Sequence, residues 1–194
     1  FLLGEINRSK GEVPKMIEYY DKALSLGNTY AKEIKVNKLV TWGNKFNEAV
    51  NNYYNRAIKI SSPDTAKMYF MKAAEILRLA VMCEPDSAAT YDVLSATLMN
   101  AGEYDEATKV LEDLRKIQPV GSTYVRLGNL YMRKAGELMI AFDNSKDVKD
   151  SVEALKYYNK TIEVLEEGKA KFPNEGDIFT LLADAYIRAN REKE

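Results

Sequence analysis

Apolar residues recur every three or four positions through most of the chain, which is the spacing of one face of an α-helix. The pattern is clearest in residues 88–119, where it predicts two antiparallel helices separated by a turn at Gly102. The rest of the chain repeats this helical hairpin with variations. The residues expected to fill the core of the hairpin are Tyr91, Leu94, Leu98, Ala107 and Leu111.

Start and stop signals predict further helices before the hairpin. Ser62 and Pro63 are typical of a helix start, with serine as the N-cap and proline in the first turn, and this helix should end before Pro85. Residues 30–60 contain no proline and keep a helical period throughout, so we expect one long helix there. A turn at 42–44, which would give two shorter helices, is the alternative.

Helical signals also continue after the hairpin. A helix beginning near Gly121 should run through Phe142, and the polar stretch 144–150 predicts a loop after it. A helix over 151–171 should follow, and Asn174 is expected to cap a last helix. The chain should therefore contain nine helices, the first of them incomplete.

The motif residues of these helices resemble those of the tetratricopeptide repeat (TPR) family, in which the first helix carries W-x2-L-G-x2-Y and the second A-x3-F. Tyr124, Leu127, Gly128 and Tyr131 give the best match, and the hairpin has Ser95 in place of the glycine. The resemblance implies an all-α fold, a right-handed superhelical array of antiparallel helix pairs, with the motif residues buried. Partial matches near the two ends are Leu3-Gly4, Phe179, Leu182, Ala183 and Tyr186.

Two of the repeats are longer than the family norm. Pro85 and Pro119 lie 34 residues apart, the TPR period, whereas Pro119 and Pro173 lie 54 apart. We expect about three extra turns on each helix of both long repeats, a protrusion of roughly 15 Å. Our hypothesis is that these tips, or the notch beside the Gly102 turn, form a second partner surface. The motif residues Tyr124 and Phe179 lie 55 residues apart, and the position 55 residues before Tyr91 is Val36. This spacing places Val36, Leu39 and Val40 at first-helix motif positions.

The predicted boundaries describe a single TPR-like solenoid over residues 1–194. Because the first residues already match the middle of a first helix, we expect the chain to be a fragment. An unpaired last helix should leave its apolar face open. The expected units are a partial repeat (1–29), a long repeat (33–87), a regular repeat (88–120), a long repeat (121–175) and the first helix of a further repeat (176–194).

TPR proteins usually bind a peptide or protein segment along the concave face lined by their first helices, and the resemblance implies this activity here. Asn129 and Arg133 are the strongest candidates, because an amide can pair with a peptide backbone and a guanidinium is a forked donor. The subtype that grips a C-terminal carboxylate is rejected, since only Arg126 matches its positions. All candidates lie between core positions of first helices: Asn37, Thr41, Lys45, Asp92, Met99, Asn100, Val125, Asn129, Met132, Arg133, Asp184 and Arg188.

Composition narrows the class of partner. Lys+Arg 28 against Asp+Glu 29 gives no case for nucleic acid, and no apolar run approaches a membrane span. With no histidine and only Cys83, the chain lacks the commonest general base and metal ligand, so we expect no enzyme activity, no cofactor and no metal. The compartment is undetermined. We predict a soluble protein-binding scaffold, with self-association or stacking on further repeats through the exposed ends as the alternative.

Overall fold

The computed structural model describes residues 1–189, and within them every regular element is a helix. The chain divides into two compact units, Phe1–Val110 and a second that begins at Leu111. The boundary falls inside α7, Tyr104–Ile117, so this helix contributes its first half to one unit and its second half to the other. Each unit is described below by itself.

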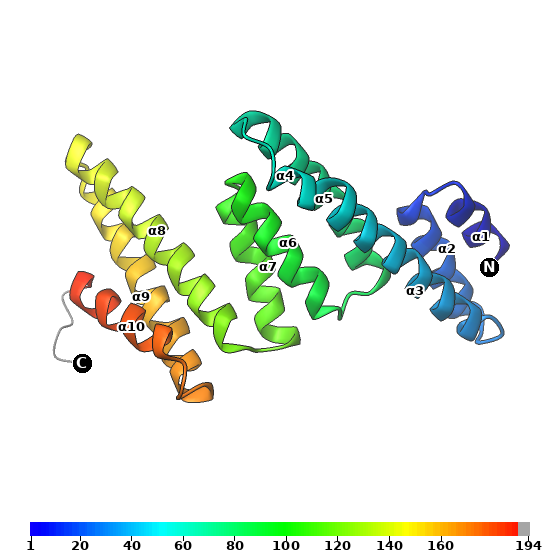
Figure 1. Cartoon of the computed structure of the whole chain (residues 1–194). Helices are drawn as coiled ribbons and strands as arrows, with labels where there is room; N and C mark the ends of the chain where they lie inside the picture. The colour runs from blue at the N-terminus through cyan, green and yellow to red at the C-terminus, as the bar shows by residue number, and fades with distance from the viewer. Residues whose placement is uncertain (190–194) are drawn as a thin grey trace. The chain divides into compact units, whose positions relative to one another are not determined.

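The first unit is built from helices that pack as antiparallel neighbours. α5 contacts both α3 before it and α6 after it, and α1 packs on α2 (Figure 1). Trp42 on α3 donates a 2.8 Å hydrogen bond from its indole to Thr90 on α6, which ties the two first helices together. Besides the first half of α7, the helices are α1 (Leu2–Ser9), α2 (Val13–Leu26), α3 (Ala31–Glu48), η1 (Ala49–Tyr54), α4 (Asn55–Ala57), α5 (Pro63–Cys83) and α6 (Ala88–Ala101).

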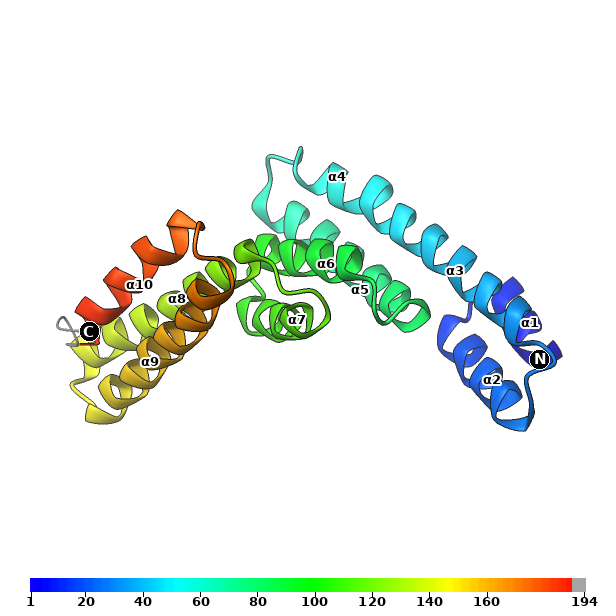
Figure 2. The same cartoon turned by 90° about the horizontal axis from the view of Figure 1, so that it is seen from below.

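The long helix predicted over residues 30–60 is confirmed. α3 passes into η1, a π-helical stretch, without a break, because Ala49 keeps helical backbone angles (φ −61°, ψ −47°). η1 continues into α4, and the three form one rod (Figure 2). The alternative of a turn at 42–44 is therefore wrong. Counting this rod as one, residues 1–189 form nine helices, the predicted number.

The second unit contains the longest helix pair of the chain. α8 (Gly121–Ser145) and α9 (Val148–Lys171) run side by side, and α10 (Gly176–Arg188) packs on both (Figure 1). The prediction of an all-α fold made of antiparallel helix pairs is confirmed. The division into repeats, and the continuity of one solenoid over both units, stay predictions.

Two predicted boundaries in the second unit are wrong. The expected loop over 144–150 shrinks to Lys146 and Asp147, because Lys146 adopts a left-handed turn (φ 57°) and the Asp147 carboxylate caps α9 by accepting a hydrogen bond from the Lys149 amide. Polar residues therefore continue both helices instead of breaking them. The residue before α10 is Glu175, not Asn174, and its side chain makes no capping hydrogen bond.

Glycines allow the helices of the second unit to approach closely. A methyl group on Gly168 of α9 would lie 2.8 Å from the Tyr124 side chain, and one on Gly128 of α8 would lie 2.9 Å from Leu165. Contacts of this length are shorter than carbon atoms tolerate, so only glycine fits without a rearrangement. Gly128 therefore has the role that the motif predicts, since it lets a first helix touch its second helix.

Most predicted core residues are buried or half-buried, and the exposed ones lie on α3 and α10. Leu94, Leu98, Ala107, Leu111, Tyr124, Leu127 and Leu182 are buried, while Tyr91, Tyr131 and Tyr186 are half-buried. Phe179 on α10 is 41% exposed, because within the described residues no helix packs on that face. Val36, Leu39 and Val40 on α3 are also exposed, and their placement in the core was wrong.

Candidate protein-binding surface

The predicted binding residues on α3 point into the first unit. Asn37 donates a 2.7 Å hydrogen bond from its amide to the carboxylate of Glu5 on α1. Thr41 donates from its hydroxyl to the carbonyl of Asn37 at 2.7 Å and approaches the sulfur of Met16 on α2 at 3.7 Å. Lys45 pairs with Glu48 at 2.8 Å. These side chains are half-buried, and the structure brings Asn37 and Thr41 together in the packing between helices.

The opposite face of α3 carries the apolar residues. Val36, Leu39 and Val40 are 52%, 50% and 47% exposed, whereas Ile34 is 1% exposed. Successive residues advance about 100° around a helix, so all three lie on the side opposite Ile34. Part of the face that α3 buries is therefore polar, and its outer face carries three apolar residues next to charged ones such as Lys32 and Lys35.

The N-terminal helix extends this apolar face. Phe1 stacks on Tyr30 with ring centroids 4.3 Å apart, and Glu5 accepts a hydrogen bond from Asn37, so α1 runs in the same direction as α3. Leu2 and Ile6 on α1 are exposed, and the 100° step places them on the outer side of this contact, facing the same way as Val36 and Val40. The α1–α3 apolar patch comprises Leu2, Ile6, Val36, Leu39 and Val40.

The carboxylate of Glu5 lies beneath the patch and connects the helices that form it. Glu5 accepts hydrogen bonds from Asn37, from Arg8 at 2.9 Å and from the Tyr20 hydroxyl. Burial disfavours its ionised form, but these hydrogen bonds and the Arg8 charge outweigh burial and lower the pKa of Glu5. Burial, and then the bond to Glu5, raise the pKa of Tyr20 to about 12. The contact between α1 and α3 is therefore an ordered, charged network beneath an apolar surface.

The remaining candidates lie on three other first helices. On α6, Asp92 and Asn100 are exposed and Met99 is half-buried. On α8, Asn129 is exposed, Val125 and Met132 are half-buried, and exposed Arg133 pairs with Glu137 at 2.9 Å. On α10, Asp184 and Arg188 pair with each other at 2.9 Å. The candidates on α3 and α6 belong to the first unit and those on α8 and α10 to the second. A single groove uniting them stays a prediction.

Charged side chains of the second unit connect helices to one another. Glu167 on α9 accepts hydrogen bonds from Lys171 at 2.7 Å, from the Tyr124 hydroxyl at 2.8 Å and from Arg115 at 2.9 Å. The bond from Lys171 is the largest cause of the lowered pKa of Glu167, although burial opposes it. Arg115 also pairs with Glu112 at 2.7 Å. This network of hydrogen bonds and ion pairs therefore joins α7, α8 and α9 to one another.

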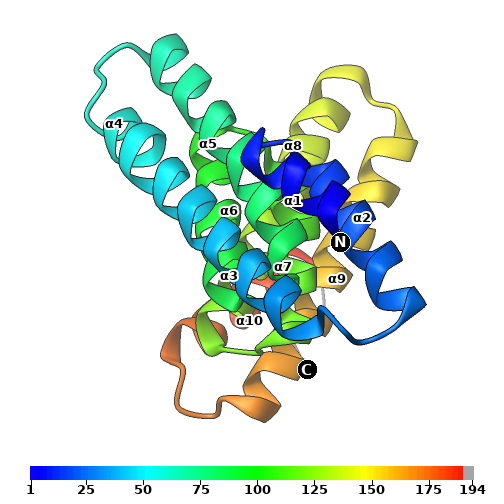
Figure 3. The ribbon, with the colours of Figure 1, turned by 90° about the vertical axis from the view of Figure 1, so that its right-hand side faces the viewer.

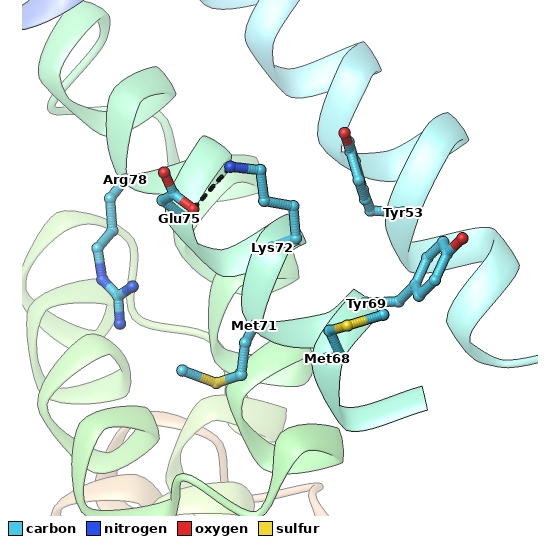
Figure 4. A pocket seen from close by; sticks show the side chains of 7 residues that line it. All are labelled: Tyr53, Met68, Tyr69, Met71, Lys72, Glu75 and Arg78. Atoms are coloured by element: carbon cyan, nitrogen blue, oxygen red, sulfur yellow. Dashed lines mark hydrogen bonds and ion pairs between the residues drawn. The ribbon is translucent and has the colours of Figure 1, made fainter. Parts of the chain in front are cut away.

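A groove along α5 was not among the predicted sites. It has a volume of about 660 Å³, and the lysine on its rim pairs with Glu75 at 2.9 Å (Figure 4). Ion pairs from Lys67 to Glu103 and from Arg78 to Glu106 join α5 to the start of α7, just after the Gly102 turn. The groove therefore lies close to the predicted notch. The sequence contained one indication of the groove, because its residues on α5 recur every three or four positions and so share one face of the helix. The groove is lined by Tyr53, Met68, Tyr69, Met71, Lys72, Glu75 and Arg78.

Acidic and cysteine side chains within residues 1–189 were compared with the needs of a metal site and of a reactive thiol. Among the described residues, no three His, Cys, Asp or Glu side chains come together in a way that could hold a metal ion. Cys83 is buried, and this burial raises the pKa of its thiol to about 11, so the reactive thiolate is disfavoured at neutral pH. None of the helices within residues 1–189 has the length and apolarity needed to cross a membrane.

Comparisons with known proteins add no assignment. No protein-family model and no curated protein sequence matches the chain. Solved structures with a partial likeness include MamA MSR-1 C2, which is 17% identical over 79% of this chain and 88% of that one (TM-score 0.44). MamA AMB-1 C2221 is 18% identical over 80% and 91% (TM-score 0.44), and a crystal structure of MamA is 16% identical over 98% and 96% (TM-score 0.33). Likenesses this weak carry no argument about fold or function.

Proposed function

We propose that this chain is a TPR-type module that binds a segment of another protein on its first helices and has no catalytic role. The observation that carries the proposal is the outward apolar face of α3. Val36, Leu39 and Val40 are each about half exposed, while polar Asn37 and Thr41 face the neighbouring helices. Exposed apolar residues that gather on one face are typical of a protein interaction site.

The aliphatic content of the α1–α3 apolar patch supports a protein as the ligand. The patch is formed by exposed side chains of two helices, and none of its residues lines the groove along α5. The α5 groove and the exposed residues Asn129 and Arg133 on α8 are further contact regions that we propose for the same class of partner.

Affinity capture from the source cells tests this proposal. Intact protein is compared with Leu39→Lys, which puts a charge into the patch, and with Glu18→Lys, a matched change at an exposed position of α2. Loss of a captured protein with Leu39→Lys alone supports the patch as a binding surface. Asn129→Ala and Arg133→Ala test the region on α8 in the same way. If all four variants retain every captured protein, the proposed surfaces are wrong.

Self-association is the second candidate function, and α10 favours it. Phe179 and Ile187 on this helix are exposed, although their neighbours Ile178 and Leu182 are buried against α8 and α9. A second copy of the chain could cover this face. Light scattering at several concentrations should then show a mass that rises with concentration for the wild type and stays monomeric for Phe179→Ser/Ile187→Ser. A concentration-independent monomer for the wild type would remove this candidate.

A further inference from the structure

We infer that the α1–α3 apolar patch binds an amphipathic helix whose flanks carry acidic residues. This inference rests on the proposed function and adds the shape and charge of the partner segment. Two features of the first unit support it, namely the alignment of the apolar side chains on two parallel helices and a row of lysines beside them.

The alignment of the patch favours a helical partner. Leu2 and Ile6 on α1, and Val36 and Val40 on α3, form two short ridges of residues four apart. Ridges of this spacing are what a third helix packs against when its own side chains lie in the groove between them. Figure 3 shows both helices together, with the N-terminus of α1 near the start of α3. Binding by a helix in such a groove is a recurring mode of protein recognition.

The charge beside the patch favours an acidic partner. Lys32, Lys35 and Lys38 follow one another at three-residue steps, so each is a neighbour of the next on the surface of α3. Lys38 approaches Asp21 at 3.8 Å, but among the described residues no acidic side chain forms an ion pair with Lys32 or Lys35. Lys32 lies one turn before Val36 and Lys35 one turn before Leu39, so both lysines border the patch.

This row of lysines is unfavourable for α3 itself. Like charges three residues apart repel one another, and a cation at the N-terminal end of a helix opposes the helix dipole, although Glu33 in the first turn of α3 offsets Lys32 there. Some lysines elsewhere, such as Lys15, Lys72 and Lys156, are each paired with a glutamate three residues away, whereas isolated lysines such as Lys22 have no ion pair among the described residues. An arrangement that weakens α3 in isolation and lies beside an exposed apolar face is explained if acidic side chains of a partner neutralise it on binding.

The test is a selection of displayed short amphipathic helices by the full chain. The library keeps leucine at the apolar positions and randomises the flanks among Glu, Gln and Lys. Wild-type protein should enrich Glu-flanked over Lys-flanked helices by roughly fivefold, the value expected for two exposed ion pairs of ordinary strength. Lys32→Glu/Lys35→Glu should reverse the preference and should still fold, because acidic residues at a helix start are favourable. Lys22→Glu, on the outer side of α2, should leave the preference unchanged.

The outcomes separate the partner's charge from the binding surface itself. Selected helices that lose binding with Leu39→Lys but show no Glu preference would overturn the acidic partner while supporting the proposed surface. Selection of no helix that depends on Leu39 would overturn both. If vesicles of phosphatidylcholine and phosphatidylserine bind the wild type and not Leu39→Lys, and no helix is selected, the patch is a lipid-binding surface and the inference is wrong.

Discussion

The amide of Asn37 donates a 2.7 Å hydrogen bond to the carboxylate of Glu5, and this contact joins α3 to α1. Ile34, one turn before Asn37 on the same helix, is buried, and the residues on the side of α3 opposite Ile34 point outward; these are Val36, Leu39 and Val40. The hydrogen bond from Asn37 and the burial of Ile34 therefore describe one rotation of α3 about its axis, in which these three apolar residues are exposed.

The Glu5 network should make the first unit sensitive to acid. The folded pKa of Glu5 is lowered, so its stabilising contribution is present above the unfolded value of about 4.3 and is lost as the pH falls through the folded pKa. We expect the free energy of unfolding of the wild type to fall by about 1 kcal/mol more than that of Glu5→Gln over this range. Chemical denaturation at a series of pH values measures it, with Glu18→Gln as the matched control. Equal acid dependence of wild type and Glu5→Gln would contradict the role of the network.

The rotation of α3 predicts unequal costs for two truncations on the same helix. Ile34→Ala removes a fully buried side chain and should lower the free energy of unfolding by about 2–4 kcal/mol. Leu39→Ala removes a half-exposed one and should change it by less than about 1 kcal/mol. Urea denaturation followed by circular dichroism compares them. A larger cost for Leu39→Ala would mean that the apolar face is buried after all.

The close approach of α9 to α8 can be tested with a pair of glycines. Gly168→Ala would place a methyl group 2.8 Å from Tyr124 and should destabilise the second unit by about 1–3 kcal/mol. Gly136→Ala, on α8 with open space around it, should stabilise the helix by about 0.5–1 kcal/mol. Thermal unfolding reports both changes. Stabilisation by both substitutions would show that the helices are further apart than described.

Cys83 provides a probe of the core of the first unit. It packs with Val13, Met16, Tyr20 and Ile34, and burial raises the pKa of its thiol to about 11. Ellman's reagent should therefore react with the native protein only as fast as this core opens, and immediately after denaturation. Rapid, complete labelling of the native protein would contradict the burial of Cys83.

The sequence alone was sufficient to predict where most helices lie and which of several motif residues are buried. Periodicity and the Ser62–Pro63 start predicted the long rod and α5, because local signals specify local structure. Gly128 was identified as a motif residue that should be buried, and the structure buries it against Leu165. Loop residues 144–150 misled the prediction because polarity alone does not distinguish an exposed helix end from a loop.

The rotation of α3 about its axis could not be predicted from periodicity and motif positions. Counting back across a lengthened repeat must be right to one residue, because an error of one turns the helix face by about 100°. The count placed Val36, Leu39 and Val40 inside, whereas the structure has Ile34 and Asn37 on the inner side. An apolar stripe also looks the same in sequence whether the chain itself or a partner covers it. Three-dimensional contacts were needed to tell these cases apart.

Photo-crosslinking from the outer face of α3 tests the central claim most directly. A benzoylphenylalanine probe replaces Leu39 in the full chain expressed in its source cells, and a control probe replaces Glu18 on α2. The account predicts a crosslink from position 39 to a specific protein, none of that product from position 18, and a lower yield when Lys32→Glu/Lys35→Glu is added. The absence of a specific crosslink from position 39, or the same product from both positions, would contradict it.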